Sequence, residues 1–181
     1  MADSVDPLAL LHQSELIHTE DTVNAAIEKL SLDISQRMAG TTPLVMCVMG
    51  GAVVFSGQLL PKLNFPLEFD YVQASRYHNQ TEGQNLVWKV EPQDNVRGRT
   101  VLLLDDILDE GHTLAAIKKK CLAQGAKEVV IAVLVEKRLE HSKPIAADFV
   151  GLTVPNRYVF GCGMDAYGWW RNLPAIYALK D

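Results

Sequence analysis

Two uninterrupted apolar runs with one helix-length segment between them restrict the fold of this chain more than any other feature. The runs are "VLLL" at residues 101–104 and "VVIAVLV" at 129–135, and residues 113–124 between them have helical apolar spacing. A strand that is apolar on both sides has to be covered on both faces, as in a parallel sheet flanked by helices. We therefore predict an α/β fold with a doubly wound, mainly parallel sheet.

The remaining segments fit around such a sheet. Residues 21–38 have the spacing of an amphipathic helix, "PLVMCVMGG" is a short apolar strand stopped by glycines, and "AVVFSGQLLPKL" has roughly helical spacing up to Pro61. "LEFDYVQAS" and "NLVWKVEP" read as two strands around a polar loop, and the C-terminal part contains the strand-like pieces "DFVGLTV", "RYVFG" and "AIYAL". We predict one domain over residues 1–181, with a core at about 40–147 and a small hood from about 1–39 and 148–181.

Composition and charge argue against several classes of protein. The net charge of −5 leaves no general basic surface, so we expect no nucleic-acid partner. The long uncharged segment at residues 43–61 is broken by glycines, so we expect no membrane span. Three cysteines without CxxC spacing and an N-terminus with acids in place of the basic residues of a secretory signal predict a cytoplasmic protein.

The string "DDILDEGHT" at residues 105–113 follows the first apolar run directly. Side chains alternate along a strand, so Asp105 and Asp106 serve one ligand only if the strand ends there, at the carboxyl edge of the sheet. Two carboxylates at that edge accept hydrogen bonds from a vicinal diol or attract Mg²⁺. Gly111, Thr113 and the N–H groups at the start of the next helix would form a phosphate cradle. An acid pair beside such a cradle indicates a sugar phosphate.

Other interpretations of this string stay open. An acid pair after an aliphatic strand also occurs in receiver-type domains and as a solvated cap, so the pair alone favours neither function nor structure. The whole string favours a ligand site, because a Gly and a Thr follow where a phosphate needs them. A Walker A loop is excluded, since no GK[ST] sequence occurs.

The segment "VLLLDDILDEGHTL" resembles the signature of the type I phosphoribosyltransferases, which bind phosphoribosyl pyrophosphate. Further segments resemble the hypoxanthine-guanine branch: "VMGGAVVFSGQLL" its glycine loop, "SRYHNQTEG" its closing loop, "LVEKR" its purine-proximal lysine and "RYVFGCGMDAYGWWRNL" its purine pocket. The resemblance covers residues 43–179, with the motifs in the family's order. It implies a magnesium-dependent transferase of purine salvage, which converts a 6-oxopurine and phosphoribosyl pyrophosphate into IMP or GMP and pyrophosphate.

The resemblance also implies roles for the residues of the central string. Asp109 would be the general base or acid at purine N7, and Asp105 and Asp106 would bind the ribose hydroxyls. The next four residues would hold the 5′-phosphate, chiefly through main-chain groups: Glu110, Gly111, His112 and Thr113.

On the purine side, the resemblance implies that Lys137 donates to the 6-oxo group and thereby selects against adenine. Tyr158 would stack on the base, and the Val159 main chain would contact its edge. Taken singly, Lys137 reads more simply as a solvated residue and Tyr158 as a core residue. Only their joint fit to one pocket favours binding.

On the pyrophosphate side, Asp165 would help to hold Mg²⁺ and Arg171 would bind pyrophosphate, while Tyr77 would lie in the closing loop. Met49–Gly50 would be the non-proline cis peptide that the family often has. Gly50 departs from the family, because many relatives carry a Lys there that contacts pyrophosphate. Glu110 departs too, since relatives commonly have Thr. A carboxylate beside a phosphate repels it, so we expect the Glu110 side chain to point outward.

The resemblance further implies a homodimer or homotetramer. Two alternatives remain: a relative that prefers xanthine, and a regulator that kept the fold, senses nucleotides and binds nucleic acid. The acidic net charge and the intact Asp109 weigh against the regulator.

Overall fold

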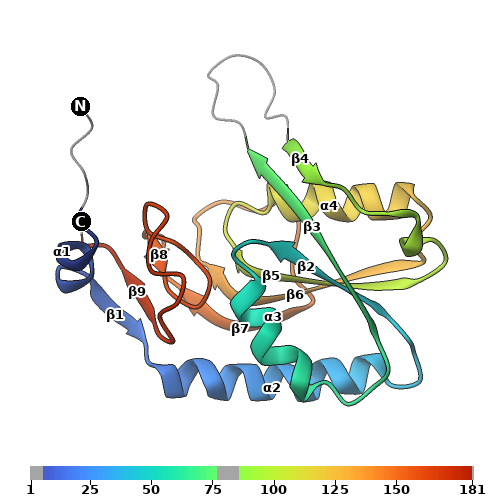
Figure 1. The fold of residues 1–181 in the computed structure, drawn as a ribbon, viewed down its shortest axis with the longest axis horizontal. Coiled ribbons are helices and arrows are strands. Elements are labelled where there is room, and N and C mark those ends of the chain that lie inside the picture. Colours follow the sequence, from blue (N-terminus) through green and yellow to red (C-terminus); the bar gives the residue numbers. More distant parts are fainter. Residues whose placement is uncertain (1–5, 77–85, 181) are drawn as a thin grey trace.

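A six-stranded sheet forms the centre of the computed structural model, which describes residues 6–76 and 86–180. Its strands are β2 (Leu44–Met49), β3 (Glu68–Arg76), β4 (Leu86–Val90), β5 (Thr100–Leu108), β6 (Glu128–Lys137) and β7 (Phe149–Val154). They are ordered β4-β3-β2-β5-β6-β7, and only β3 and β4 pair antiparallel (Figure 1). The predicted mainly parallel sheet is confirmed.

Helices cover both faces of this sheet. α2 (Glu20–Met38) and α3 (Val53–Leu59) pack on one face, and α4 (His112–Ala123) packs on the other. Along β5, Leu102 and Leu104 join the apolar layer of α2 and α3, whereas Val101 and Leu103 join the layer of α4. The uninterrupted apolar runs therefore reflect burial on both faces, as predicted.

Local sequence explains where α2 begins. The Thr19 side chain accepts a hydrogen bond from the Thr22 N–H at 3.3 Å, and the apolar stripe that starts at Val23 is buried against the sheet. Two short 3-10 turns, η1 (Leu60–Lys62) and η2 (Asp94–Val96), lie in connections. Among the helices of the described residues, none is both long and apolar enough to span a bilayer.

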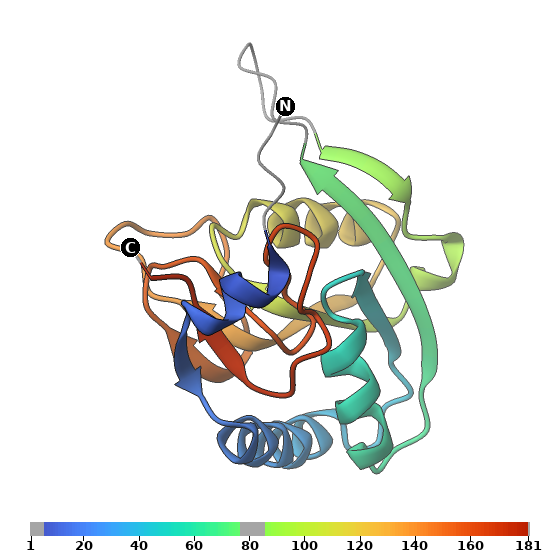
Figure 2. The ribbon, with the colours of Figure 1, turned by 60° about the vertical axis from the view of Figure 1, so that its left-hand side comes forward.

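A second sheet joins the two ends of the chain (Figure 2). After α1 (Pro7–His12), β1 (Glu15–His18) pairs antiparallel with β9 (Ile176–Ala178), which pairs antiparallel with β8 (Val159–Phe160). This hood is smaller than the predicted one. β7 pairs with β6 in the large sheet, and α2 packs on β7, so both elements belong to the core layers.

The outer part of the large sheet leaves some apolar side chains in solvent. On β3, Phe69 is 52% exposed and Tyr71 is 44% exposed, whereas Val72 is fully buried in the α4 layer. The alternation of residue types identified this strand correctly. It did not show which of its faces is covered.

Candidate active site

The site lies where the order of the parallel strands reverses. The chain passes from β2 to β3 on one side of the sheet and from β5 to β6 on the other. β2 pairs with β5 only as far as Cys47↔Leu104, whereas β6 accompanies β5 to Leu108↔Glu136. The last part of β5 is therefore open on its β2 side, at the kind of switch point where α/β sheets bind ligands.

The position of the acid pair corrects one sequence prediction. β5 does not end at Asp105 and Asp106 but continues to Leu108. By strand alternation, Asp105 lies on the α4 side with Leu103, and Asp106 lies on the hood side with Leu104. The Asp106 N–H donates to Asp105 Oδ1 at 3.0 Å, and each residue is 8% exposed. Both still line one cavity, because the pairing of β5 with β2 has already ended at Leu104.

Burial makes this pair costly to ionise. It raises the pKa of Asp105 well above that of an ordinary carboxyl, and the charge of Asp106 raises it further. Burial also raises the pKa of Asp106, although hydrogen bonds and the positive charge of Arg171 oppose that effect. Hydroxyl donors or a cation from a ligand would offset the lost hydration, so the pair is suited to binding rather than to stability.

Two glycines let other segments approach the acid pair. A Cβ on Gly51 would lie 1.9 Å from Asp106 Oδ2, and a Cβ on Gly163 would lie 1.9 Å from the Gly51 carbonyl oxygen. The loop after β2 thus packs directly against Asp106, and the loop between β8 and β9 (residues 161–175), which we call the hood loop, packs against the loop after β2. The Met49–Gly50 peptide bond is cis, as expected.

The acid pair opens into a cavity of about 270 Å³, which we call the cradle cavity. Its lining includes most of the central string: Asp105, Asp106, Asp109, Glu110, Gly111 and Thr113. α4 begins here after Gly111, whose φ of 81° favours glycine, and no side chain of the described residues caps the helix. Its first N–H groups are thus available to an anion. His112 is exposed and does not line this cavity.

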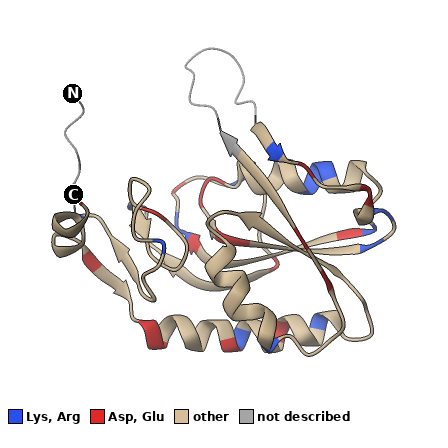
Figure 3. Cartoon of the chain, in the orientation of Figure 1, with Lys and Arg blue, Asp and Glu red and all other residues tan. Residues whose placement is uncertain are grey.

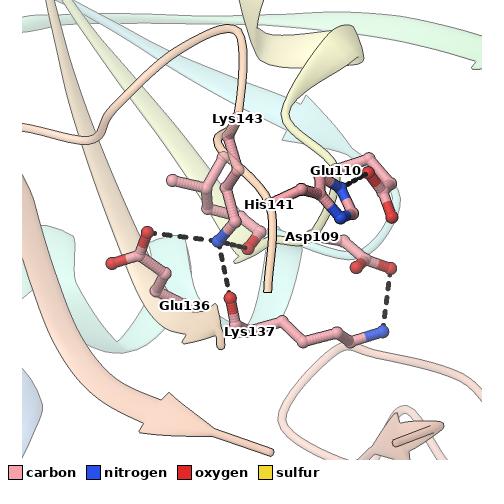
Figure 4. Close-up of polar contacts among 7 residues, drawn as sticks. Asp109, Glu110, Glu136, Lys137, His141 and Lys143 are labelled. Carbon is pink, nitrogen blue, oxygen red and sulfur yellow. Dashed lines mark hydrogen bonds and ion pairs between the residues drawn. The ribbon is translucent and has the colours of Figure 1, made fainter. Parts of the chain in front are cut away.

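Glu110 contacts a different part of the chain. Its Oε2 lies 2.9 Å from His141 Nε2, in the loop between β6 and β7 (Figure 4). Glu110 also belongs to the lining of the cradle cavity. Its outward orientation in the presence of a phosphate stays a prediction.

A second cavity of about 240 Å³, the hood cavity, lies between the strand ends and the hood. It brings together residues from three distant segments: Asp106, Asp109, Lys137, Tyr158, Val159 and Asp165. Lys137 Nζ lies 2.9 Å from Asp109 Oδ2 (Figure 4). A lysine donor and a carboxylate acceptor thus stand side by side in a cavity that adjoins the cradle through Asp106 and Asp109.

The aromatic wall of the hood cavity has two layers. The rings of Tyr158 and Tyr167 are parallel to within 9°, with centroids 5.9 Å apart. Tyr158 lines the hood cavity, whereas Tyr167 lines a separate hollow beside α1. Sequence reasoning missed Tyr167, as well as Ile107 and Met164 in the lining, since nothing in the local pattern distinguishes them from packing residues.

Asp165 and Arg171 are held together in the hood loop. They form an ion pair, while Asp165 Oδ2 accepts from the Gly168 N–H at 2.8 Å and Arg171 Nη1 donates to the Gly163 carbonyl at 2.7 Å. Arg171 does not line the hood cavity, although its positive charge lowers the pKa of Asp106. Tyr77, which the sequence predicts to lie in a closing loop, is outside the described residues.

An acid pair at a switch point, a helix N-terminus open to an anion and an adjoining cavity under a hood define an α/β enzyme for phosphorylated sugars or nucleotides. The sequence model of the phosphoribosyl transferase domain matches residues 13–167, and the chain belongs to this family. Its architecture is the type I phosphoribosyltransferase fold.

Individual relatives fall in the same group. A hypoxanthine-guanine phosphoribosyltransferase of Bacillus subtilis is 32% identical over 167 residues, which cover 92% of this chain and 93% of that protein. A bifunctional protein of Listeria innocua, TilS/HprT, is 34% identical over 92% of this chain, which spans only 26% of that longer protein. A crystal structure of a hypoxanthine-guanine phosphoribosyltransferase from Bacillus anthracis, with a HEPES molecule in its active site, is 26% identical and superposes with a TM-score of 0.85 over 92% of this chain and 98% of that one.

Proposed function

We propose that this chain transfers the 5-phosphoribosyl group from phosphoribosyl pyrophosphate to hypoxanthine or guanine in purine salvage. The observation that carries this proposal is the pairing of Lys137 with Asp109 in a cavity that shares Asp106 and Asp109 with the phosphate cradle. A base in the hood cavity and a ribose phosphate in the cradle cavity would then meet at the end of β5.

The donor sugar has a complementary partner for each of its groups. The free N–H groups of the first turn of α4 would hold the 5′-phosphate, with the Thr113 hydroxyl beside them. Asp105 and Asp106 would accept hydrogen bonds from the ribose hydroxyls. These hydrogen bonds would replace some of those to water that the buried carboxylates lose on folding.

The base has partners that distinguish oxo from amino groups. A lysine ammonium has three donors and no acceptor. Lys137 can therefore keep its ion pair with Asp109 and still donate a hydrogen bond to a 6-oxo group. The 6-amino group of adenine offers it no acceptor. Tyr158, backed by Tyr167, would supply the stacking face.

The transfer forms a bond between a purine imidazole nitrogen and ribose C1 and breaks the bond between C1 and the pyrophosphate oxygen. The proton on purine N7 would pass to Asp109, a role that is supported by the presence of Asp109 in the lining of both cavities. General base catalysis of this kind contributes about 10²–10⁴-fold. Arg171 would bind the departing pyrophosphate.

The donor set of the site fits Mg²⁺ that is shared with the substrate. Among residues 6–76 and 86–180, no cluster of three or more acidic, His or Cys side chains forms a closed metal cage. Mg²⁺ commonly binds through one or two carboxylates together with substrate oxygens. The carboxylate of Asp165, which retains acceptor capacity beside Arg171 and Gly168, would serve as its protein ligand. When bound, the ion would neutralise charge on the leaving pyrophosphate.

The setting of the enzyme is also part of the proposal. Three unpaired, buried cysteines suit a cytoplasmic location, and exposed Phe69 and Tyr71 on β3 suit a homodimer or homotetramer. Lys and Arg are spread over several elements rather than gathered in one patch, which argues against a nucleic-acid partner (Figure 3). Light scattering at several protein concentrations tests the assembly.

One assay tests the activity. Purified protein with phosphoribosyl pyrophosphate and Mg²⁺ receives hypoxanthine, guanine, xanthine or adenine, and both nucleotide and pyrophosphate are measured. We expect efficient product formation with the first two bases and very little with adenine. Preference for xanthine would change the assigned substrate from hypoxanthine or guanine to xanthine. If no base led to pyrophosphate release, the proposed activity would be wrong and a regulator would be favoured.

A further inference from the structure

A lysine with a buried side chain, outside both ligand cavities, joins the ends of the neighbouring strands β5 and β6. The Lys143 side chain is only 9% exposed, and its Nζ donates to the carbonyl oxygens of Leu108 at 3.0 Å and Lys137 at 2.6 Å. It also donates to Glu136 Oε1 at 3.1 Å (Figure 4). Three acceptors thus match the three N–H groups of one ammonium.

These acceptors lie where the backbone pairing of β5 with β6 ends. Leu108 is the last residue of β5 and Lys137 is the last residue of β6, and their ladder ends at Leu108↔Glu136. Asp109 follows Leu108 directly. Lys143 therefore continues the connection between the two strands beyond the last backbone pair, directly behind the residues that face the base.

The loop that carries Lys143, residues 138–148, also packs against the cradle. A Cβ on Gly111 would lie 3.0 Å from Ile145 Cγ2 and 3.6 Å from Lys143 Cβ. His141 of the same loop contacts Glu110. The loop thus rests on the phosphate cradle at two places, while its lysine fixes the strand ends.

We propose that Lys143 is a positioning residue that sets the separation of Asp109 and Lys137 and thereby the recognition of the 6-oxopurine. This inference rests on the proposed function of the hood cavity. Lys143 does not touch the base: it lines a separate cavity of about 750 Å³ behind the strand ends, together with Glu136, Lys137 and His141. It acts through the carbonyl groups of Leu108, which directly precedes Asp109, and of Lys137 itself.

Loss of this ammonium should strongly lower kcat/KM for the base and should change the affinity for the donor sugar little. Without it, two carbonyl groups at the strand ends lose a charged donor and Glu136 loses its counter-charge. A displacement of about 1 Å in a reacting group lowers turnover on the order of 10²-fold. The acid pair lies within the β5–β6 ladder and the first turn of α4 is held by its own backbone, so phosphoribosyl pyrophosphate should still bind.

The test substitutes Lys143→Met, which keeps an unbranched side chain of nearly the same length and removes the donors. Lys120→Met is the matched control, because Lys120 forms a more exposed ion pair with Glu91 at 2.9 Å. We expect kcat/KM for hypoxanthine to fall on the order of 10²-fold, with an increased KM for the base. The dissociation constant for phosphoribosyl pyrophosphate, measured without base, and the circular dichroism spectrum should match wild type, and the control should match it throughout.

A second variant keeps the inference testable if Lys143→Met does not fold. Lys143→Gln retains two donors on one nitrogen and should give kcat/KM for hypoxanthine below wild type, again without loss of donor-sugar affinity. Wild-type kcat/KM in a folded variant, or equal losses for base and donor sugar, would overturn the positioning role. Failure of the proposed function is distinct, since it would appear as no nucleotide formation by the wild-type protein.

Discussion

Lys137 Nζ lies 2.9 Å from Asp109 Oδ2, so the ends of two neighbouring parallel strands present a cation and a carboxylate to one cavity. Parallel pairing makes this meeting possible, because Leu108 and Glu136 are partners at the end of the β5–β6 ladder and the next residue of each chain segment carries one of the two charges. In the proposed function, Lys137 would donate to the 6-oxo oxygen of the purine and Asp109 would accept the proton from N7. Four predictions depend on this arrangement and on the acid pair beside it.

Substitution of Asp109→Asn should keep the fold and the affinity for phosphoribosyl pyrophosphate but lower kcat by about 10²–10⁴-fold, since the amide cannot accept the N7 proton. The Asn oxygen can still accept from Lys137, which limits the change in structure. Steady-state kinetics with hypoxanthine and guanine, together with calorimetric titration of the donor sugar, measure both quantities. Near wild-type kcat with both bases would remove the assignment of Asp109 as the base.

Substitution of Lys137→Met should weaken discrimination between 6-oxopurines and adenine. A hydrogen bond from a charged donor contributes about 1.5–3 kcal/mol, so kcat/KM for hypoxanthine should fall roughly 10- to 150-fold. Adenine turnover, which gains nothing from the lysine, should change much less. The ratio of the two kcat/KM values is the measurement, and the exposed Lys119→Met on α4 is the control for loss of one positive charge. An unchanged ratio would contradict the role of Lys137.

Local sequence patterns predicted much of the fold and of the site. The apolar runs of β5 and β6 and the glycine before α4 are local signals, and they placed Asp109, Gly111 and Lys137 at one edge of a parallel sheet. The length of β5 was not a local signal. The strand continues beyond Asp106 because β6 stays beside it, and that pairing depends on a segment more than twenty residues away.

The remaining differences also arise from contacts between distant segments. The strand at 149–154 is like the other C-terminal pieces in sequence, and only its pairing with β6 places it in the large sheet. The contacts of Tyr167 with Tyr158 and of Lys143 with Leu108 join loops whose paths depend on the completed fold. Such residues have ordinary polar or aromatic sequence neighbours, so no spacing rule identifies them.

The acid pair should lower the stability of the protein as the pH rises. Because the folded state raises the pKa of Asp105, it binds the proton more tightly than the unfolded state, and the free energy of unfolding falls from the ordinary carboxyl pKa of about 4 upward. Asp105→Asn cannot ionise and keeps an oxygen for the Asp106 N–H. Its melting temperature should exceed that of wild type at neutral pH, and the difference should shrink at about pH 4.

The same variant should lose affinity for phosphoribosyl pyrophosphate, which links the gain in stability to a loss of function. Thermal melts from acid to neutral pH and calorimetric titration of the donor sugar measure the two effects. Asp33→Asn, at an exposed ion pair with Lys29, serves as the control and should show neither. A melting temperature below that of wild type at neutral pH would contradict the destabilising effect of the buried charge.

Substitution of Gly51→Ala should impair binding of the donor sugar while leaving the fold in place. The new Cβ would lie 1.9 Å from Asp106 Oδ2, and the group that has to move is the end of a side chain, so the carboxylate shifts rather than the backbone. Because a misplacement of about 1 Å costs on the order of 10²-fold in turnover, kcat/KM for phosphoribosyl pyrophosphate should fall by that order. Gly57→Ala is the matched control: it lies in α3 with nothing within 4 Å of its Cβ, and it should raise stability by roughly 0.5–1 kcal/mol without changing kcat/KM. If Gly51→Ala kept the wild-type kcat/KM, Asp106 would tolerate displacement, and its close contact with the glycine loop would not be needed for binding the donor sugar.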